Sequence, residues 1–205
     1  MPQGERLHRR LTVLGAVLVL AGGIAACTSG GGAEPDPTAG ATGTATAPPS
    51  EDPPAERPEV EKPVPPETMA RDDVAGAEAA AQYFLELYRY TYATGDLNAF
   101  QEMSHADCIF CSEVADDVSA LYGKGGYVKD GAFTVERVSG QAPVEGNDFY
   151  RVDLLVTEAP SVRFEGSGDS QERSGGSNLL IFAVGRADTG WMVREVQIEE
   201  PDFNG

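Results

Sequence analysis

Apolar and polar residues repeat at helical spacing over residues 74–95. An apolar stripe at i, i+3, i+4 and i+7 is typical of one buried helix face. Asp72 or Asp73 can cap the start of this helix, and Gly95 can end it in the left-handed conformation. The stripe consists of Ala77, Ala80, Ala81, Phe84, Leu87, Tyr88 and Thr91, and the opposite side carries Glu78, Gln82, Glu86 and Arg89.

Two shorter helices are expected next. Asp96 can cap a short helix that runs through Met103, because an aspartate oxygen accepts hydrogen bonds from the first free backbone N–H groups. A third helix follows Asp107, and the Gly-rich residues 123–126 stop it. Its apolar stripe consists of Phe110, Val114, Val118 and Leu121.

The second half of the chain has the patterns of strands. The expected strands lie within residues 133–138, 148–159, 178–186 and 191–198, and the polar, Gly-rich residues 166–177 are expected to form a loop. In the second strand Tyr150, Val152, Leu154 and Val156 share one face, and Phe149, Arg151, Asp153, Leu155 and Thr157 share the other. Helices followed by strands predict an α+β fold, with N-terminal helices packed on a curved antiparallel sheet of about four strands.

Residues 1–26 have the features of a signal peptide: Arg6, Arg9 and Arg10 precede a short apolar run. The run is shorter than the roughly 20 residues that a membrane span needs. Residues 24–27 (IAAC) resemble a bacterial lipobox. That resemblance implies cleavage before Cys27 and attachment of a diacylglycerol, which carries two acyl chains such as palmitate, to the thiol of Cys27. We expect a lipid anchor on the outer face of the cell membrane; the alternatives are an uncleaved anchor or a plain secretory signal.

Residues 27–69 are expected to be the lipidated cysteine and a disordered tether, and residues 70–205 the folded domain. Ten of the fourteen prolines lie in residues 28–67, where Val60 and Val64 are the only large aliphatic residues. Such a segment cannot bury enough apolar surface to offset the entropy of ordering it. We therefore expect it to hold the domain away from the membrane.

The chain is strongly acidic, with a formal net charge of −18. Removal of residues 1–26 takes away three arginines and one glutamate, which makes the charge −20. This balance argues against nucleic acid as a partner and against electrostatic docking on anionic lipid. An acidic surface also keeps a protein soluble without any partner.

Cys108 and Cys111 remain once Cys27 carries lipid. An even pair in an exported protein is typical of a disulfide. A redox centre is an alternative, since a helix start stabilises a thiolate, but no strand leads into the motif. A zinc site needs about four ligands, and only His105 is close in sequence. We expect a structural disulfide and no metal or cofactor.

The order of elements resembles the nuclear-transport-factor-two-like, or SnoaL-like, cone over roughly residues 72–200. The Ala-rich first helix, the turn at residues 94–96 (TGD) and the segment 190–198 (GWMVREVQI) carry this resemblance. The whole chain also resembles uncharacterised secreted actinobacterial lipoproteins, through its lipobox, its Pro-rich tether, the TGD turn, the C-x-x-C and Gly125-Gly126. These resemblances imply a fold and a location at the cell surface, but no activity.

Cones of this kind can enclose a pocket in which an acid or base works beside tyrosine donors. By this resemblance the candidate catalytic residues are Asp153, Glu195, Tyr88 and His105, with Tyr92, Tyr122 and Tyr127 as further pocket tyrosines. The tyrosines can equally be packing residues, the charged residues cross-strand ion pairs, and His105 a helix-end residue.

We therefore expect a non-catalytic ligand-binding or accessory interaction domain, whose partner is a small apolar ligand or a cell-envelope protein. Two alternatives stay open. One is a SnoaL- or ketosteroid-isomerase-like enzyme that uses a pocket Asp/Tyr pair, and the other is a C-x-x-C redox protein. A homodimer through Phe149 and Leu155 on the open face of the sheet is also possible for such a cone.

Overall fold

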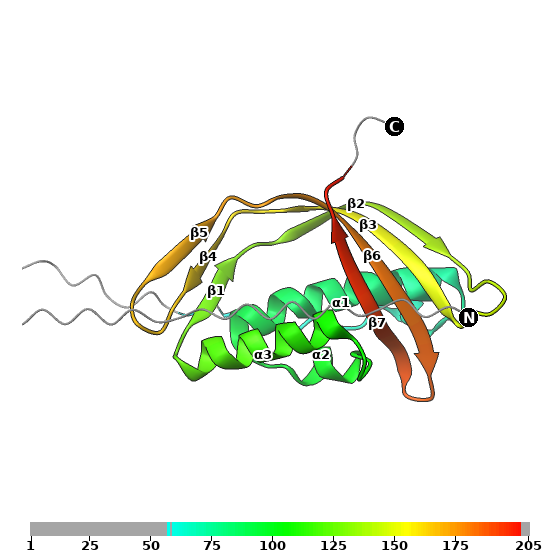
Figure 1. The fold of residues 1–205 in the computed structure, drawn as a ribbon, viewed down its shortest axis with the longest axis horizontal. Coiled ribbons are helices and arrows are strands. Elements are labelled where there is room, and N and C mark those ends of the chain that lie inside the picture. The colour runs from blue at the N-terminus through cyan, green and yellow to red at the C-terminus, as the bar shows by residue number, and fades with distance from the viewer. Residues whose placement is uncertain (1–56, 58, 202–205) are drawn as a thin grey trace, which may run out of the picture. The chain divides into compact units, whose positions relative to one another are not determined.

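Three helices lie on the concave side of two curved antiparallel sheets in the computed structural model, which describes residue 57 and residues 59–201 (Figure 1). The expected signal peptide, Cys27 and most of the expected tether lie outside the described residues. A short 3-10 helix, η1 (Glu67–Ala70), precedes the three helices, which are α1 (Val74–Thr94), α2 (Asn98–Glu102) and α3 (Ile109–Gly123). The predicted α+β class is confirmed.

The ends of α1 follow from two residues that its sequence singled out. Asp73 Oδ1 accepts a hydrogen bond from the Gly76 N–H at 3.1 Å and so caps the first turn. Gly95 has a φ of 79°, the left-handed conformation that glycine adopts without steric cost. The apolar stripe is buried between these ends, with Ala77, Ala80 and Leu87 wholly inaccessible.

The four expected strands form one antiparallel sheet in the order β2-β3-β6-β7. They are β2 (Phe133–Gln141), β3 (Phe149–Glu158), β6 (Gly176–Ala187) and β7 (Gly190–Glu199). The predicted alternation along β3 is confirmed, because Val152, Leu154 and Val156 are fully buried while Asp153 and Leu155 lie on the other face. This sheet packs its apolar face against α1.

A second, three-stranded sheet was not predicted. It has the order β1-β4-β5, with β1 (Tyr127–Asp130), β4 (Ser161–Phe164) and β5 (Ser170–Arg173). The expectation of a loop over residues 166–177 is thus wrong for β5 and for the start of β6. All four residues of β5 are polar and exposed, so no alternation marks it; its antiparallel pairing with β4 holds it in place. Figure 1 shows β4 and β5 extending the hairpin of β3 and β6 past a bend.

Part of the expected tether, residues 59–69, contacts the helices and the sheet. Residues 59–66 lie beside α1: the Tyr83 hydroxyl donates to the Pro63 carbonyl at 3.4 Å, and Lys62 pairs with Asp96 at 3.5 Å. Trp191 Nε1 donates to the Met69 carbonyl at 2.8 Å. Composition did not reveal these contacts, because an extended Pro-rich segment can pack on a helix without an apolar pattern of its own.

Aromatic side chains fill the space between the helices and the four-stranded sheet. The rings of Phe84 and Phe100 stack with centroids 4.5 Å apart, and Phe182 meets Phe84 edge-on at 6.3 Å. All three side chains are fully buried. Within residues 59–201, no helix is long and apolar enough to cross a membrane.

Candidate ligand-binding site

A small cavity remains between α1 and the junction of the two sheets. Its volume is about 50 Å³, which corresponds to room for about four water molecules. Pockets for small-molecule ligands typically have volumes of roughly 300–1,000 Å³, so this cavity can take only a small group. It is lined by Tyr88, Arg89, Tyr92, Val128, Asp130, Gly131, Phe133, Glu158, Ser161, Arg163 and Arg173.

One wall of the cavity is held by an ion-pair network that joins β4, α3 and α1. The guanidinium of Arg163 donates from Nη1 and Nη2 to the two carboxylate oxygens of Asp117, both at 2.8 Å. Its Nε donates to Glu165 at 2.9 Å, and the Tyr92 hydroxyl donates to Asp117 Oδ2, also at 2.9 Å. Arg163 is therefore paired with two carboxylates of the protein itself. Its hydrogen bonds lower the pKa of Asp117.

Tyr88 contributes a neutral polar group to the cavity, and Glu158 a partly buried acidic one. Burial raises the pKa of Tyr88, whose ring lies 5.0 Å from that of Tyr92 and 5.9 Å from that of Phe110. Burial also raises the pKa of Glu158, and the positive charge of Arg173 opposes that shift. Tyr88 therefore stays a neutral donor, and Glu158 is a carboxyl group that has lost part of its hydration.

Arg89 is the unusual residue of the site. Its Nε is buried and has no hydrogen-bond partner, and no ion pair within the described residues reaches its guanidinium. Together with Phe133 it lines both the cavity and a neighbouring groove between α1 and residues 60–64. A buried donor without a partner costs roughly 1–3 kcal/mol, so its presence here needs an explanation.

The sequence model of a family of unknown function (DUF6318) matches residues 46–197. The chain belongs to this family. The matched region contains every residue that lines the cavity, the cysteine pair, and residues 59–69, which lie against the domain. No curated protein matches the sequence.

Several solved structures are similar to this DUF6318 chain. The intermembrane space region of the chloroplast protein ARC6 aligns with a TM-score of 0.49 and 12% identity, over 64% of this chain and 99% of its own. Aln2 from a Streptomyces species aligns with a TM-score of 0.39 and 10% identity, over 59% and 88%. An NTF2-like protein with a cystatin-like fold from Novosphingobium aromaticivorans aligns with a TM-score of 0.39 and 14% identity, over 63% and 84%.

The structure of this DUF6318 member separates the sequence candidates. Tyr88 and Tyr92 line the cavity, but Asp153 and Glu195 do not. Asp153 points to the outer face of the sheet and pairs with Arg151 at 2.8 Å, while exposed Glu195 accepts from Gln197 at 2.6 Å. The partly buried carboxyl group in the cavity is instead that of Glu158, at the end of β3, and the exposed carboxyl of Asp130 also lines it. No motif in the sequence marks either residue.

Tyr122 and Tyr127 do not line the cavity. Their rings lie beside Arg57, which precedes η1. The guanidinium of Arg57 lies 5.4 Å from the centre of the Tyr122 ring and 5.9 Å from that of Tyr127. Burial raises the pKa of Tyr122 to about 12, against the opposing charge of Arg57. These tyrosines therefore contact the segment before η1.

The cysteine pair lies at the start of α3. The sulfur atoms of Cys108 and Cys111 are 1.96 Å apart, which is disulfide distance, and the two residues are only 1% and 3% exposed. Cys108 itself is the N-cap, since its Sγ accepts from the Cys111 N–H at 3.2 Å. Asp107, which precedes it, is not the cap. Such buried sulfur atoms are poorly accessible to a redox partner.

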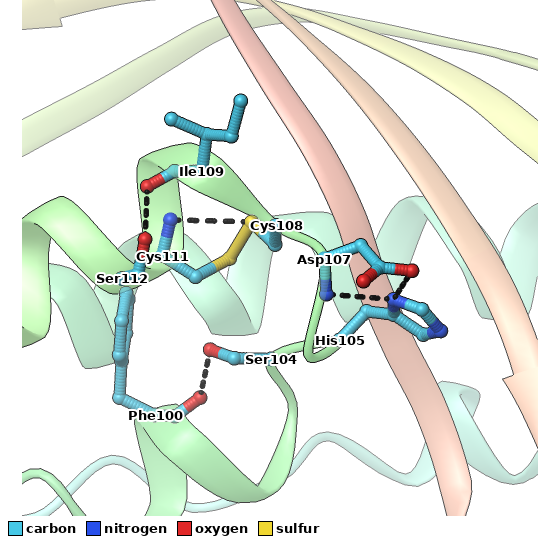
Figure 2. Close-up of a disulfide and its surroundings, with 8 residues drawn as sticks. All are labelled: Phe100, Ser104, His105, Asp107, Cys108, Ile109, Cys111 and Ser112. Atoms are coloured by element: carbon cyan, nitrogen blue, oxygen red, sulfur yellow. Dashed lines mark hydrogen bonds and ion pairs between the residues drawn. A yellow bond between two sulfur atoms is a disulfide. The ribbon is translucent and has the colours of Figure 1, made fainter.

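His105 belongs to the loop before the disulfide. Figure 2 shows its ring beside Asp107 and turned away from the sulfur atoms. Its Nδ1 accepts a hydrogen bond from the Asp107 N–H at 3.1 Å, which assigns the ring to the turn that leads into α3. Within residues 59–201, no cluster of His, Cys, Asp and Glu has the arrangement of a metal site.

Proposed function

We propose that this chain is a cell-surface lipoprotein whose folded domain is a non-catalytic binding module. The observation that carries the proposal is the filled interior. Phe84, Phe100 and Phe182 pack where a cone could enclose a substrate, and the cavity beside α1 has a volume of about 50 Å³. A ring-sized substrate needs several times that volume, so this cavity takes only a small ligand, and a larger partner would bind at the surface.

The anchor is part of the proposal. Its support is the sequence IAAC at residues 24–27 after a basic and apolar leader, followed by a Pro-rich segment. Two acyl chains on Cys27 would hold the protein firmly, since one chain alone binds marginally. Cells that express the full chain should incorporate labelled palmitate and retain the protein in the membrane fraction. The Cys27→Ser variant should do neither, and unchanged labelling of that variant would refute the anchor.

One observation favours a second candidate, an enzyme that transfers protons. Glu158 has a raised pKa and lines the same cavity as Tyr88, and a carboxyl group of this kind can act as an acid or base. The volume of the cavity opposes this candidate. The redox alternative is opposed by the burial of both cysteines.

A titration separates a binding module from an enzyme with an enclosed substrate. The full chain in detergent is titrated with ring-sized apolar ketones, and proton exchange into each ketone is followed by NMR. We expect no saturable binding and no exchange above the rate in buffer. Saturable binding with exchange that disappears in the Glu158→Gln variant would overturn the non-catalytic proposal in favour of the second candidate.

A further inference from the structure

We infer that the cavity beside α1 binds the head group of a small zwitterion of the α-amino acid class, with the carboxylate on Arg89 and the ammonium group on Glu158. This inference rests on the proposed binding function and names its ligand. The two charged side chains line one cavity, yet no hydrogen bond or ion pair joins them in the described structure. A ligand with both charges can lie between them.

Arg89 has the chemistry to bind a carboxylate. Its planar guanidinium presents a fork of donors that matches a carboxylate in two parallel hydrogen bonds. Buried polar groups in folded proteins nearly always have partners, and the exceptions need a specific explanation. The buried Nε of Arg89 is such an exception within the described residues. No hydrogen bond or ion pair reaches the remainder of the Arg89 guanidinium within the described residues either, so a carboxylate bound to its Nη atoms would give this side chain a partner.

The other charges of the cavity are already paired or solvated. Arg163 is occupied by Asp117 and Glu165. Asp130 and Arg173 are exposed, so water hydrates both of them. Arg89 and Glu158 are the partly buried charges that remain. Because they are opposite in sign, a simple anion would meet the Glu158 carboxylate and a simple cation would meet Arg89, whereas a zwitterion matches both.

The size and access of the cavity agree with this ligand. A volume of about 50 Å³ suits a carboxylate, an ammonium group and the carbon between them. Tyr88 and Ser161 add hydroxyl groups to the lining. Arg89 and Phe133 also line the neighbouring groove, whose apolar residues include Val60, Leu85 and Val135. Because the groove shares Arg89 and Phe133 with the cavity, we place a short side chain of the ligand on its apolar residues.

Calorimetric titration of the full chain in detergent tests the inference with three compounds that share one skeleton. Alanine carries both charges, propionate lacks the ammonium group, and ethylammonium lacks the carboxylate. We expect saturable binding of alanine and at least about tenfold weaker binding of each single-charge compound, since a hydrogen-bonded charge left without its partner costs at least that factor. Equal binding of propionate and alanine would overturn the zwitterion, and so would no binding of alanine.

Variants then test the two residues. Arg89→Met and Glu158→Gln should each weaken alanine binding by about tenfold or more. The matched control is Arg151→Met on the outer face of the sheet, which should bind as the native chain does. Arg89→Met should also keep or raise the melting temperature without ligand, because it removes an unsatisfied buried donor; a purely structural arginine would lower it.

A second arginine variant covers the case in which Arg89→Met does not fold. Arg89→Lys keeps the charge but lacks the fork, so it should still weaken alanine binding, and native affinity would contradict the assignment. The outcomes also separate the two proposals. Failure of alanine to bind removes the ligand class and leaves the binding module intact, whereas turnover of a ketone removes the non-catalytic function itself.

Discussion

The structure predicts which double replacement of Cys108 and Cys111 destabilises the fold least. The disulfide closes a loop with a sequence separation of 3, and the chain-entropy relation gives such a loop about 2 kcal/mol. The remaining effects depend on position. Both residues are buried in the core, at 1% and 3% exposure, but only Cys108 also caps α3, through its sulfur.

Cys108→Ser with Cys111→Ala should therefore be the mildest double variant. Serine at the cap still accepts the backbone hydrogen bond, and alanine in the core adds no polar group. This variant should lose about 2–3 kcal/mol, or about 7–10 °C of melting temperature for a domain of this size. Cys108→Ala with Cys111→Ser should lose about 2 kcal/mol more, because it removes the cap and buries a hydroxyl group.

Thermal unfolding followed by circular dichroism measures both variants, with urea titration as the cross-check on free energy. The reference is the native chain, melted with and without reductant. Equal stability of the two variants would refute the argument that Cys108 acts as a cap and Cys111 as a core residue. A Ser/Ala variant that is unfolded at 25 °C would refute the premise that the bridge is a modest staple.

Three further predictions follow from other contacts. Asp117→Asn should cost about 1 kcal/mol at pH 7, since its partner Arg163 is mostly buried while the Asp117 side chain is 42% exposed. The pKa of Asp117 is lowered in the folded state, so this cost should shrink as the pH falls below the ordinary carboxyl pKa of about 4 and through the lowered one. A difference from the native chain that does not shrink over that range would contradict the linkage. Trp191→Phe removes the hydrogen bond to Met69, so proteolysis near residue 69 should become faster, and an unchanged rate would show that this bond does not hold the segment. If the outer sheet face forms a homodimer, Leu155→Glu should convert it to a monomer in analytical ultracentrifugation; a native chain that is monomeric at high concentration removes the dimer.

The sequence predicted the helices and the large sheet because both have strong periodic patterns. The buried stripe of α1 and the alternation in β3 each extend over several turns or residue pairs, so burial of one face leaves little choice of arrangement. The second sheet has no such pattern. Its strands are only four residues long, and β5 has no buried residue, so its position depends on the hairpin that it extends.

The composition of the cavity could not be predicted for a related reason. Glu158 ends a strand, and Arg89 falls on the side of α1 that the sequence assigned to solvent. Both become lining residues only because β1, β4 and residues 60–64 lie close by. Asp153 looked equally suitable in the sequence, but the alternation of β3 places it on the opposite face from Val152 and Leu154. The alternation of inward and outward side chains along β3 decides the face on which Asp153 lies, and the sequence alone shows this alternation.

Arg89 shows how the two sides of α1 relate to function. A helix that is covered on one side only would leave Arg89 in water, where an arginine needs no partner. Here residues 60–64 lie beside the second side and, with Phe133, leave its Nε buried without a hydrogen bond. A chain selected for stability alone would gain from an apolar residue at this position. Buried donors elsewhere in a fold have partners, and a single exception of this kind is expected where a protein binds its ligand.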